Sequence, residues 1–172
     1  MKQSQVILGL VNPKSPDNVG SVLRAAANYR VDKVFYTGDR YPRAIERKAR
    51  SVDMSRKISK DVLISRAECL IEVVSKDMKI VCVELAVNAI PLPEYQHPEN
   101  ALYIFGPEDG SIDQDIIDQA DAVVYVPTVG CMNLSASVNV LLYDRLVKAA
   151  NYHANNELIR KNRDTNNRLK VV

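Results

Sequence analysis

The chain has 172 residues, of which 47% are apolar and 26% are charged, and its formal net charge at pH 7 is +2. This is the length of one domain with a sizeable core, and no apolar run approaches the roughly 18–20 residues that a membrane helix needs. The three cysteines, Cys69, Cys82 and Cys131, lack the spacing of metal ligands and are odd in number. We therefore expect no metal site, no disulfide framework and a cytoplasmic protein.

Charge is distributed unevenly along the chain. Residues 1–60 carry 13 Lys and Arg against 5 Asp and Glu, whereas residues 61–121 carry 3 against 13. Residues 40–60 alone hold eight basic and two acidic residues. Such a chain can present a basic face to phosphates while its net charge stays near neutral, although a solvated charged surface gives the same pattern.

Short apolar runs alternate with amphipathic segments. The run at residues 6–11 is too short for the core of a signal peptide and indicates a strand buried on both faces. Further strands are predicted at residues 33–36, 79–85, 102–105 and 122–126. Strands that alternate with helices predict an α/β domain with a mostly parallel sheet and flanking helices.

Three helices are predicted between these strands, at residues 18–29, 61–75 and 135–152. In the second, Asp61 is a possible cap, and apolar residues recur at helical spacing: Leu63, Ala67, Leu70, Ile71 and Val74. In the third, the expected inner face is Val138, Leu141, Leu142 and Leu146. The segment after residue 154 is polar and basic, so we divide the chain into a domain at residues 1–154 and a flexible tail at residues 155–172.

Three junctions between a strand and the following loop carry unusual residues. The first contains Asn12, Asn18, Gly20 and Arg24; the second runs from Gly106 through Glu108 and Asp109 to Gly110; the third covers residues 126–135. In parallel α/β sheets, ligands bind where loops leave the carboxyl ends of strands. Each residue also has an ordinary interpretation, since Asn18 and Ser135 can cap helices, the glycines can serve turns, and Arg24 can be a surface residue.

Common catalytic motifs are missing from the sequence. It contains no dinucleotide-binding or phosphate-binding glycine loop and no zinc-protease motif. His97 lies in a proline-rich stretch and His153 near the end of the last predicted helix, so neither resembles the base of a catalytic triad. This argues against a hydrolase or a kinase.

The same three junctions resemble the three motifs of the SpoU/TrmH family of RNA 2′-O-methyltransferases, in order and over most of residues 6–146. The motifs are N-x₅-NVGSVLRAA from Asn12, IFGPEDG from Ile104, and VP-x₃-CMNLS from Val126, where x₅ and x₃ stand for five and three further residues. The resemblance implies a SPOUT fold with a C-terminal trefoil knot, S-adenosylmethionine as cofactor, and methylation of a ribose 2′-hydroxyl.

The resemblance also implies which residues form the site. Around the cofactor it places Val83, Glu84, Leu85, Gly106, Val126, Cys131, Met132 and Leu134, and it gives catalytic roles to Arg24, Asn18, Glu108 and Asn133. Arg24 would clamp a phosphate and stabilise the forming alkoxide, with Glu108 holding it in place. A glycine at 106 would let the backbone approach the ligand closely. The family commonly has serine where this chain has Cys131, and a thiol is a weaker hydrogen-bond donor.

As partners, the resemblance implies RNA and a second copy of the chain, because the family site needs both subunits of a homodimer. The chain has little beyond the domain of the resemblance, as in the small tRNA ribose methyltransferases, which favours tRNA over rRNA. Two alternatives stay open. One is a non-catalytic RNA-binding protein with the same fold, which Cys131 supports, and the other is an rRNA 2′-O-methyltransferase.

Overall fold

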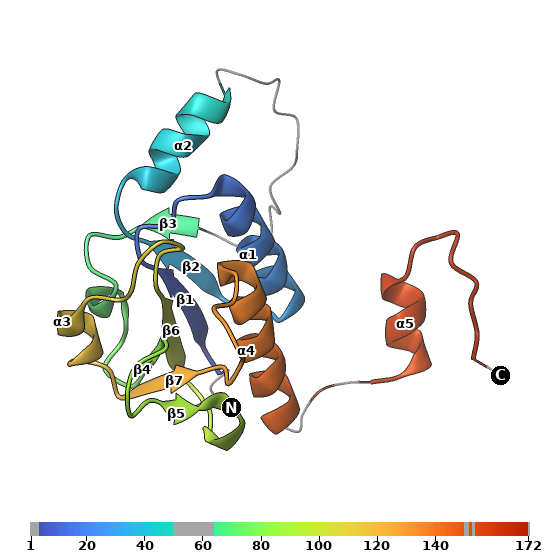
Figure 1. The fold of residues 1–172 in the computed structure, drawn as a ribbon. Coiled ribbons are helices and arrows are strands. Elements are labelled where there is room, and N and C mark those ends of the chain that lie inside the picture. The colour runs from blue at the N-terminus through green and yellow to red at the C-terminus, as the bar shows by residue number, and fades with distance from the viewer. Residues whose placement is uncertain (1–3, 50–63, 150–151, 153, 172) are drawn as a thin grey trace.

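The computed structural model describes residues 4–49, 64–149, 152 and 154–171. Within them the chain forms one parallel sheet of seven strands in the order β3-β2-β1-β6-β4-β7-β5 (Figure 1). The strands are β1 (Val6–Leu10), β2 (Lys33–Tyr36), β3 (Ile64–Arg66), β4 (Lys79–Val83), β5 (Ile90–Pro91), β6 (Ala101–Phe105) and β7 (Ala122–Tyr125). The predicted α/β class with a mostly parallel sheet is confirmed.

Helices and loops cover both faces of this sheet. The helices are α1 (Pro16–Asn28), α2 (Arg40–Ala49), α3 (Gln114–Ile117), α4 (Leu134–Lys148) and α5 (Asn156–Asn162), with 3₁₀ turns at Ile71–Val73 and Leu92–Glu94. Helices α1 and α4 pack side by side on one face, while α3 lies on the other (Figure 1). No helix among these residues is long and apolar enough to cross a bilayer.

Alternate residues of the central strands fill two separate apolar layers. Leu8 and Tyr103 belong to the layer under α1 and α4, whereas Ile7 and Leu102 belong to the layer on the opposite face. All five residues of β1 and of β6 are buried. The continuous apolar runs of the sequence follow from this burial on both faces.

The predicted helix at residues 61–75 is wrong where the structure describes it. Residues 64–66 form the edge strand β3, which pairs in parallel with β2, and only the 3₁₀ turn at Ile71–Val73 follows. The apolar spacing that suggested a helix belongs to a loop under the sheet, where Leu70 is buried beside Gly9. Asp61 and Leu63 lie outside the described residues.

Other predicted boundaries shift by a few residues because different side chains cap the helices. Ser15, not Asn18, caps α1 and accepts a hydrogen bond from the backbone of Asn18; Asn133, not Ser135, caps α4. Helix α4 ends at Lys148, and of its predicted inner face Leu146 is only partly buried.

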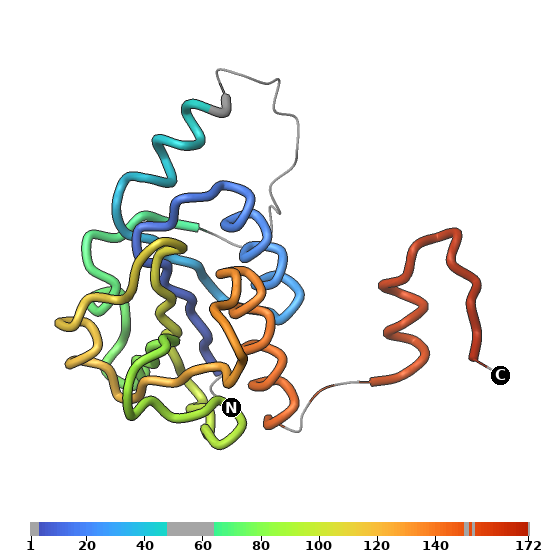
Figure 2. The backbone as a smooth tube through the Cα atoms, viewed as in Figure 1, coloured from blue at the N-terminus to red at the C-terminus, as the bar shows by residue number. Residues whose placement is uncertain are grey.

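The C-terminal part of the chain contains one helix that was not predicted. The sequence did not predict α5, a short helix whose side chains are exposed and which lies away from the sheet in the backbone trace (Figure 2). The division at residue 154 and the trefoil knot stay predictions.

Candidate active site

A pocket opens at the carboxyl ends of β4, β6 and β7. Its wall includes all eight residues expected around the cofactor: Val83, Glu84, Leu85, Gly106, Val126, Cys131, Met132 and Leu134. The second and third sequence motifs, together with the end of β4, form this wall. The prediction missed several other lining residues, among them Phe105, Tyr125, Thr128 and Ser137.

Glu84 and Gly106 lie next to each other in the wall of this pocket. The Glu84 carboxylate accepts hydrogen bonds from the backbone N–H of Leu85 at 2.9 Å and of Ile112 at 3.0 Å. A Cβ on Gly106 would lie 3.1 Å from the Glu84 carboxylate and 3.3 Å from the Ile112 nitrogen. The position is therefore tightly packed within the protein, and a role of Gly106 in close approach of a ligand stays a prediction.

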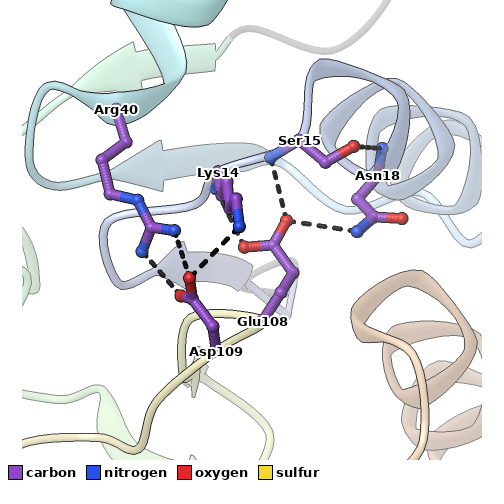
Figure 3. A network of polar contacts seen from close by, with 6 residues as sticks. All are labelled: Lys14, Ser15, Asn18, Arg40, Glu108 and Asp109. Atoms are coloured by element: carbon purple, nitrogen blue, oxygen red, sulfur yellow. Dashed lines mark hydrogen bonds and ion pairs between the residues drawn. The ribbon is translucent and has the colours of Figure 1, made fainter.

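Glu108 joins the second motif to the start of α1 (Figure 3). Its carboxylate accepts hydrogen bonds from the backbone N–H of Lys14 at 2.8 Å, from the backbone N–H of Ser15 at 3.0 Å, and from the Asn18 amide at 3.1 Å. Partial burial acts to raise the pKa of Glu108, but these hydrogen bonds outweigh it and hold that pKa below its usual value. Glu108 is therefore a carboxylate at neutral pH.

Asn18 connects this carboxylate to the third motif. Its side-chain oxygen accepts a hydrogen bond of 3.0 Å from the amide of Asn133. The Asn133 oxygen in turn accepts a hydrogen bond of 2.9 Å from the backbone of Ser135 and so caps α4. One continuous network, Glu108–Asn18–Asn133, thus links three loops that are distant in sequence, and it contains three of the four predicted catalytic residues.

Arg24, the fourth, lies apart from this network. It is exposed on the outer face of α1, shared with Gly20 and Ser21, and is not among the pocket-lining residues. In the described part of the chain it makes no hydrogen bond or ion pair, and Glu108 is bonded to other groups. Glu108 and Arg24 are therefore not in contact within one chain, and a role of Glu108 in holding Arg24 stays a prediction.

The sequence analysis also missed a second carboxylate contact beside the pocket. Asp109 binds the Arg40 guanidinium with both oxygens and also meets Lys14 (Figure 3). The only signal in the sequence was a general one, an acidic loop in one motif and a basic segment elsewhere. Residues 50–60 of that basic segment lie outside the described residues.

Comparisons with known proteins agree with this arrangement. The model of the SpoU rRNA Methylase family matches residues 5–143. The chain belongs to this family. Its activity is that of an RNA 2′-O-methyltransferase with S-adenosylmethionine as the methyl donor. Among curated proteins, no sequence matches the chain significantly.

Solved structures of similar fold include other SpoU proteins. The TrmH/SpoU tRNA modifying enzyme of A. aeolicus has a TM-score of 0.69 and 17% identity, over 86% of this chain and 77% of that one. A structure on the 2-OH methylation of C/U34 on tRNA has a TM-score of 0.68 and 16% identity, over 87% and 94%. The SpoU methyltransferase AviRb from Streptomyces viridochromogenes has a TM-score of 0.67 and 16% identity, over 87% of this chain and 62% of that one.

The lining of the pocket suits the cofactor of this family. Apolar side chains such as Val83, Val126 and Leu134 provide a surface for an adenosine group, and the carboxylates of Glu84 and Glu108 lie in the same wall. Negative charge there favours a ligand that carries a positive sulfonium. Cys131 is an exposed free thiol in this wall, at the position where the family commonly has serine.

Proposed function

We propose that the chain methylates a ribose 2′-hydroxyl in tRNA and that it works as a homodimer. The main support is the Glu108–Asn18–Asn133 network, which joins the three motif loops at the rim of a pocket lined by all eight expected cofactor residues. The trefoil knot and a cytoplasmic location belong to the same proposal.

The preference for tRNA is supported by the extent of the match to a tRNA-modifying structure. The chain covers 94% of the protein in the structure on the 2-OH methylation of C/U34 on tRNA, so that protein has little beyond the shared domain. By contrast, the chain covers 56% of the rRNA methyltransferase from Sinorhizobium meliloti. The near-complete match to this tRNA-modifying structure therefore supports a tRNA substrate.

The exposed side of α4 supports the homodimer. Val140, Tyr143 and Val147 recur at intervals of three and four residues, and they are 37%, 59% and 45% exposed. They form an apolar stripe on the side of the helix opposite the buried residues Val138, Leu141 and Leu142. A second copy that packs on this stripe would bury it, and it would allow the exposed Arg24 of one subunit to approach the pocket of the other.

In this proposal each polar residue has a distinct role. S-adenosylmethionine, when bound, supplies a methyl group on a positive sulfonium. A guanidinium stays protonated and is a poor base, so Arg24 acts as a phosphate clamp and stabilises negative charge on the ribose oxygen. The hydroxyl proton leaves to water or to a phosphate oxygen. Asn18, Asn133 and Glu108 hold the loops that position the ribose.

The first test is the replacement Arg24→Ala. Loss of one donor aimed at developing charge lowers a rate by about 10²–10³, so we expect a drop of this size in single-turnover methylation. Cofactor affinity, measured by calorimetry, should stay within a few-fold of wild type. Arg24→Lys should restore only part of the rate, because an ammonium lacks the bidentate fork. Normal methylation by Arg24→Ala would make Arg24 an ordinary surface residue.

Mixing two inactive variants tests the homodimer directly. Arg24→Ala keeps its pocket, and Cys131→Trp keeps its arginine but fills the pocket from an exposed loop position. If Arg24 serves the partner's pocket, equal mixing yields heterodimers with one complete site and recovers about one quarter of the wild-type rate. If the arginine serves its own pocket, the mixture stays inactive.

The identity of the RNA is tested by mapping ribose methylation in cells that lack the gene. Loss of one 2′-O-methyl group from a tRNA supports the proposal, whereas loss from rRNA supports the alternative substrate. No loss from either, together with absent transfer in vitro, supports a non-catalytic RNA-binding protein. In that last case Cys131→Ser shows whether the thiol is the reason, since it restores the hydroxyl common in the family.

A further inference from the structure

The first residue of α2 is bonded to the loop of the second motif. The Arg40 guanidinium donates from Nη1 to Oδ1 of Asp109 at 2.8 Å and from Nη2 to Oδ2 at 2.7 Å. Lys14 Nζ adds a weaker contact to Oδ2 at 3.4 Å (Figure 3). The side-chain hydrogen bond from Arg40 lowers the pKa of Asp109 to about 2, so the carboxylate is charged throughout the neutral range. A bidentate pair fixes direction as well as distance.

Helix α2 has few other attachments to the sheet. Of its described side chains only Tyr41 is buried, and its ring meets that of Tyr36 edge to face at 5.1 Å. Ile45 is already 37% exposed, and the helix extends away from the sheet beyond it (Figure 1). Among the described residues, α2 is held by this apolar anchor, by contacts with α1 and by the Arg40–Asp109 pair, and only the ion pair joins it to the loop of the second motif.

The helix carries its arginines along one side. Arg40, Arg43 and Arg47 are spaced by three and four residues, which places them in one row about 10 Å long. Arg43 and Arg47 are exposed, and Arg43 forms an ion pair with Asp39 of the preceding turn. Guanidinium groups in a row suit the phosphates of a nucleic acid strand.

We propose that the Arg40–Asp109 pair is a positioning device that aims the arginine row of α2 along the path by which RNA reaches the pocket. In this proposal the loop of the second motif positions two helices, α1 and α2, through two adjacent carboxylates. Glu108 holds the start of α1, and Asp109 holds the start of α2. Asp109 is thus a positioning residue for RNA and does not act on the methyl group. This inference rests on the proposed RNA methyltransferase function.

The test compares Asp109→Asn with Asp39→Asn. Both remove one negative charge near α2, and Asn at position 39 can still cap a helix. If charge alone mattered, both variants would bind RNA more tightly. The proposal instead expects Asp109→Asn to weaken the binding of a tRNA substrate by about 5-fold, the scale of one well-placed surface ion pair. Asp39→Asn should bind at least as tightly as wild type, and Asp109→Glu should recover part of the loss.

The salt dependence of binding gives a second readout. Fewer arginine–phosphate contacts release fewer counterions, so the slope of log affinity against log salt should become shallower by about 1–2 in Asp109→Asn. Cofactor affinity and thermal midpoint should match those of Asp39→Asn. The proposal is overturned if Asp109→Asn binds RNA like wild type, or if its main defect is in cofactor affinity. A wild-type protein that methylates no RNA would instead remove the proposed function itself.

Discussion

Helix α4 is held at its two ends by polar networks of opposite character. At its start, Asn133 caps the helix and joins Asn18 and Glu108, and this network lies in exposed loops beside the pocket. Near its end, the His97 side chain is only 4% exposed and bridges the Tyr103 hydroxyl at 2.7 Å and the Asp144 carboxylate at 2.8 Å. One helix thus connects a solvent-facing network with a buried one.

The neighbours of His97 show what the second network does. Arg145 donates to the Tyr103 hydroxyl and to the backbone oxygens of Pro98 and Glu99, while Lys148 donates to the backbone oxygen of Leu92. These bonds tie the loop before β6 to α4. A buried network has fixed partners and contributes to stability, whereas an exposed one can exchange partners with a substrate. The comparison therefore assigns folding to one end of α4 and function to the other.

The largest predicted effect is a loss of stability when the buried network around His97 is disrupted. His97→Ala removes a ring with two hydrogen bonds and leaves its partners in a cavity, so we expect the free energy of unfolding to fall by about 2–4 kcal/mol. Urea denaturation measures this. Methyl transfer by the folded fraction should stay near wild type. Gln96→Ala, at an exposed neighbouring position, is the matched control and should change stability little. Equal stability of His97→Ala and this control would contradict the comparison.

A substitution in the exposed network should lower the methylation rate and leave stability nearly unchanged. Glu108→Gln has one acceptor oxygen where the carboxylate has two, so it cannot hold Lys14, Ser15 and Asn18 as before. We expect single-turnover methylation to fall by about 10-fold, while the free energy of unfolding changes by no more than about 1 kcal/mol. Glu94→Gln, the same chemical change at an exposed site, serves as control. A large loss of stability without loss of rate would reverse the assignment.

The pocket and the long-range side-chain contacts differ in how far the sequence could predict them. The edge of the sheet where the pocket lies was predictable, because the motif loops follow buried strands whose carboxyl ends meet there. The individual cofactor residues came from the resemblance. The Arg40–Asp109 and His97–Asp144 contacts span 69 and 47 residues, and no local pattern marks either pair. For the same reason His97 seemed to lie in an ordinary proline-rich stretch.

Local patterns also misled where tertiary contacts decide the structure. The apolar spacing of residues 64–74 fits a helix, yet pairing with β2 makes residues 64–66 a strand. Arg24 was placed correctly on a helix, but its proposed role depends on a second subunit, and no local pattern within the chain marks a contact between subunits. The family resemblance implied a catalytic role for Arg24 but did not indicate which residues Arg24 contacts.

The smallest effect we predict is a dependence of stability on pH through His97. Burial lowers the pKa of His97 and outweighs the hydrogen bond that its ring donates to Asp144, so the ring is neutral in the folded protein. Neutral His97 can donate from one nitrogen to Asp144 and accept from the Tyr103 hydroxyl with the other, which satisfies both contacts.

The direction of this pH dependence follows from which state, folded or unfolded, binds the proton on His97. As the pH falls below about 6.5, the unfolded chain gains a proton on His97 that the folded protein does not, so the free energy of unfolding decreases until the lowered folded pKa is reached. Within this range the free energy of unfolding can fall by at most about 1.4 kcal/mol per pH unit. His97→Gln lacks the titrating ring, so the wild-type minus variant difference in urea denaturation isolates this group. If that difference instead grows as the pH falls, the attraction of Asp144 exceeds the cost of burial, and the end of α4 carries a charged pair like the one at Asp109.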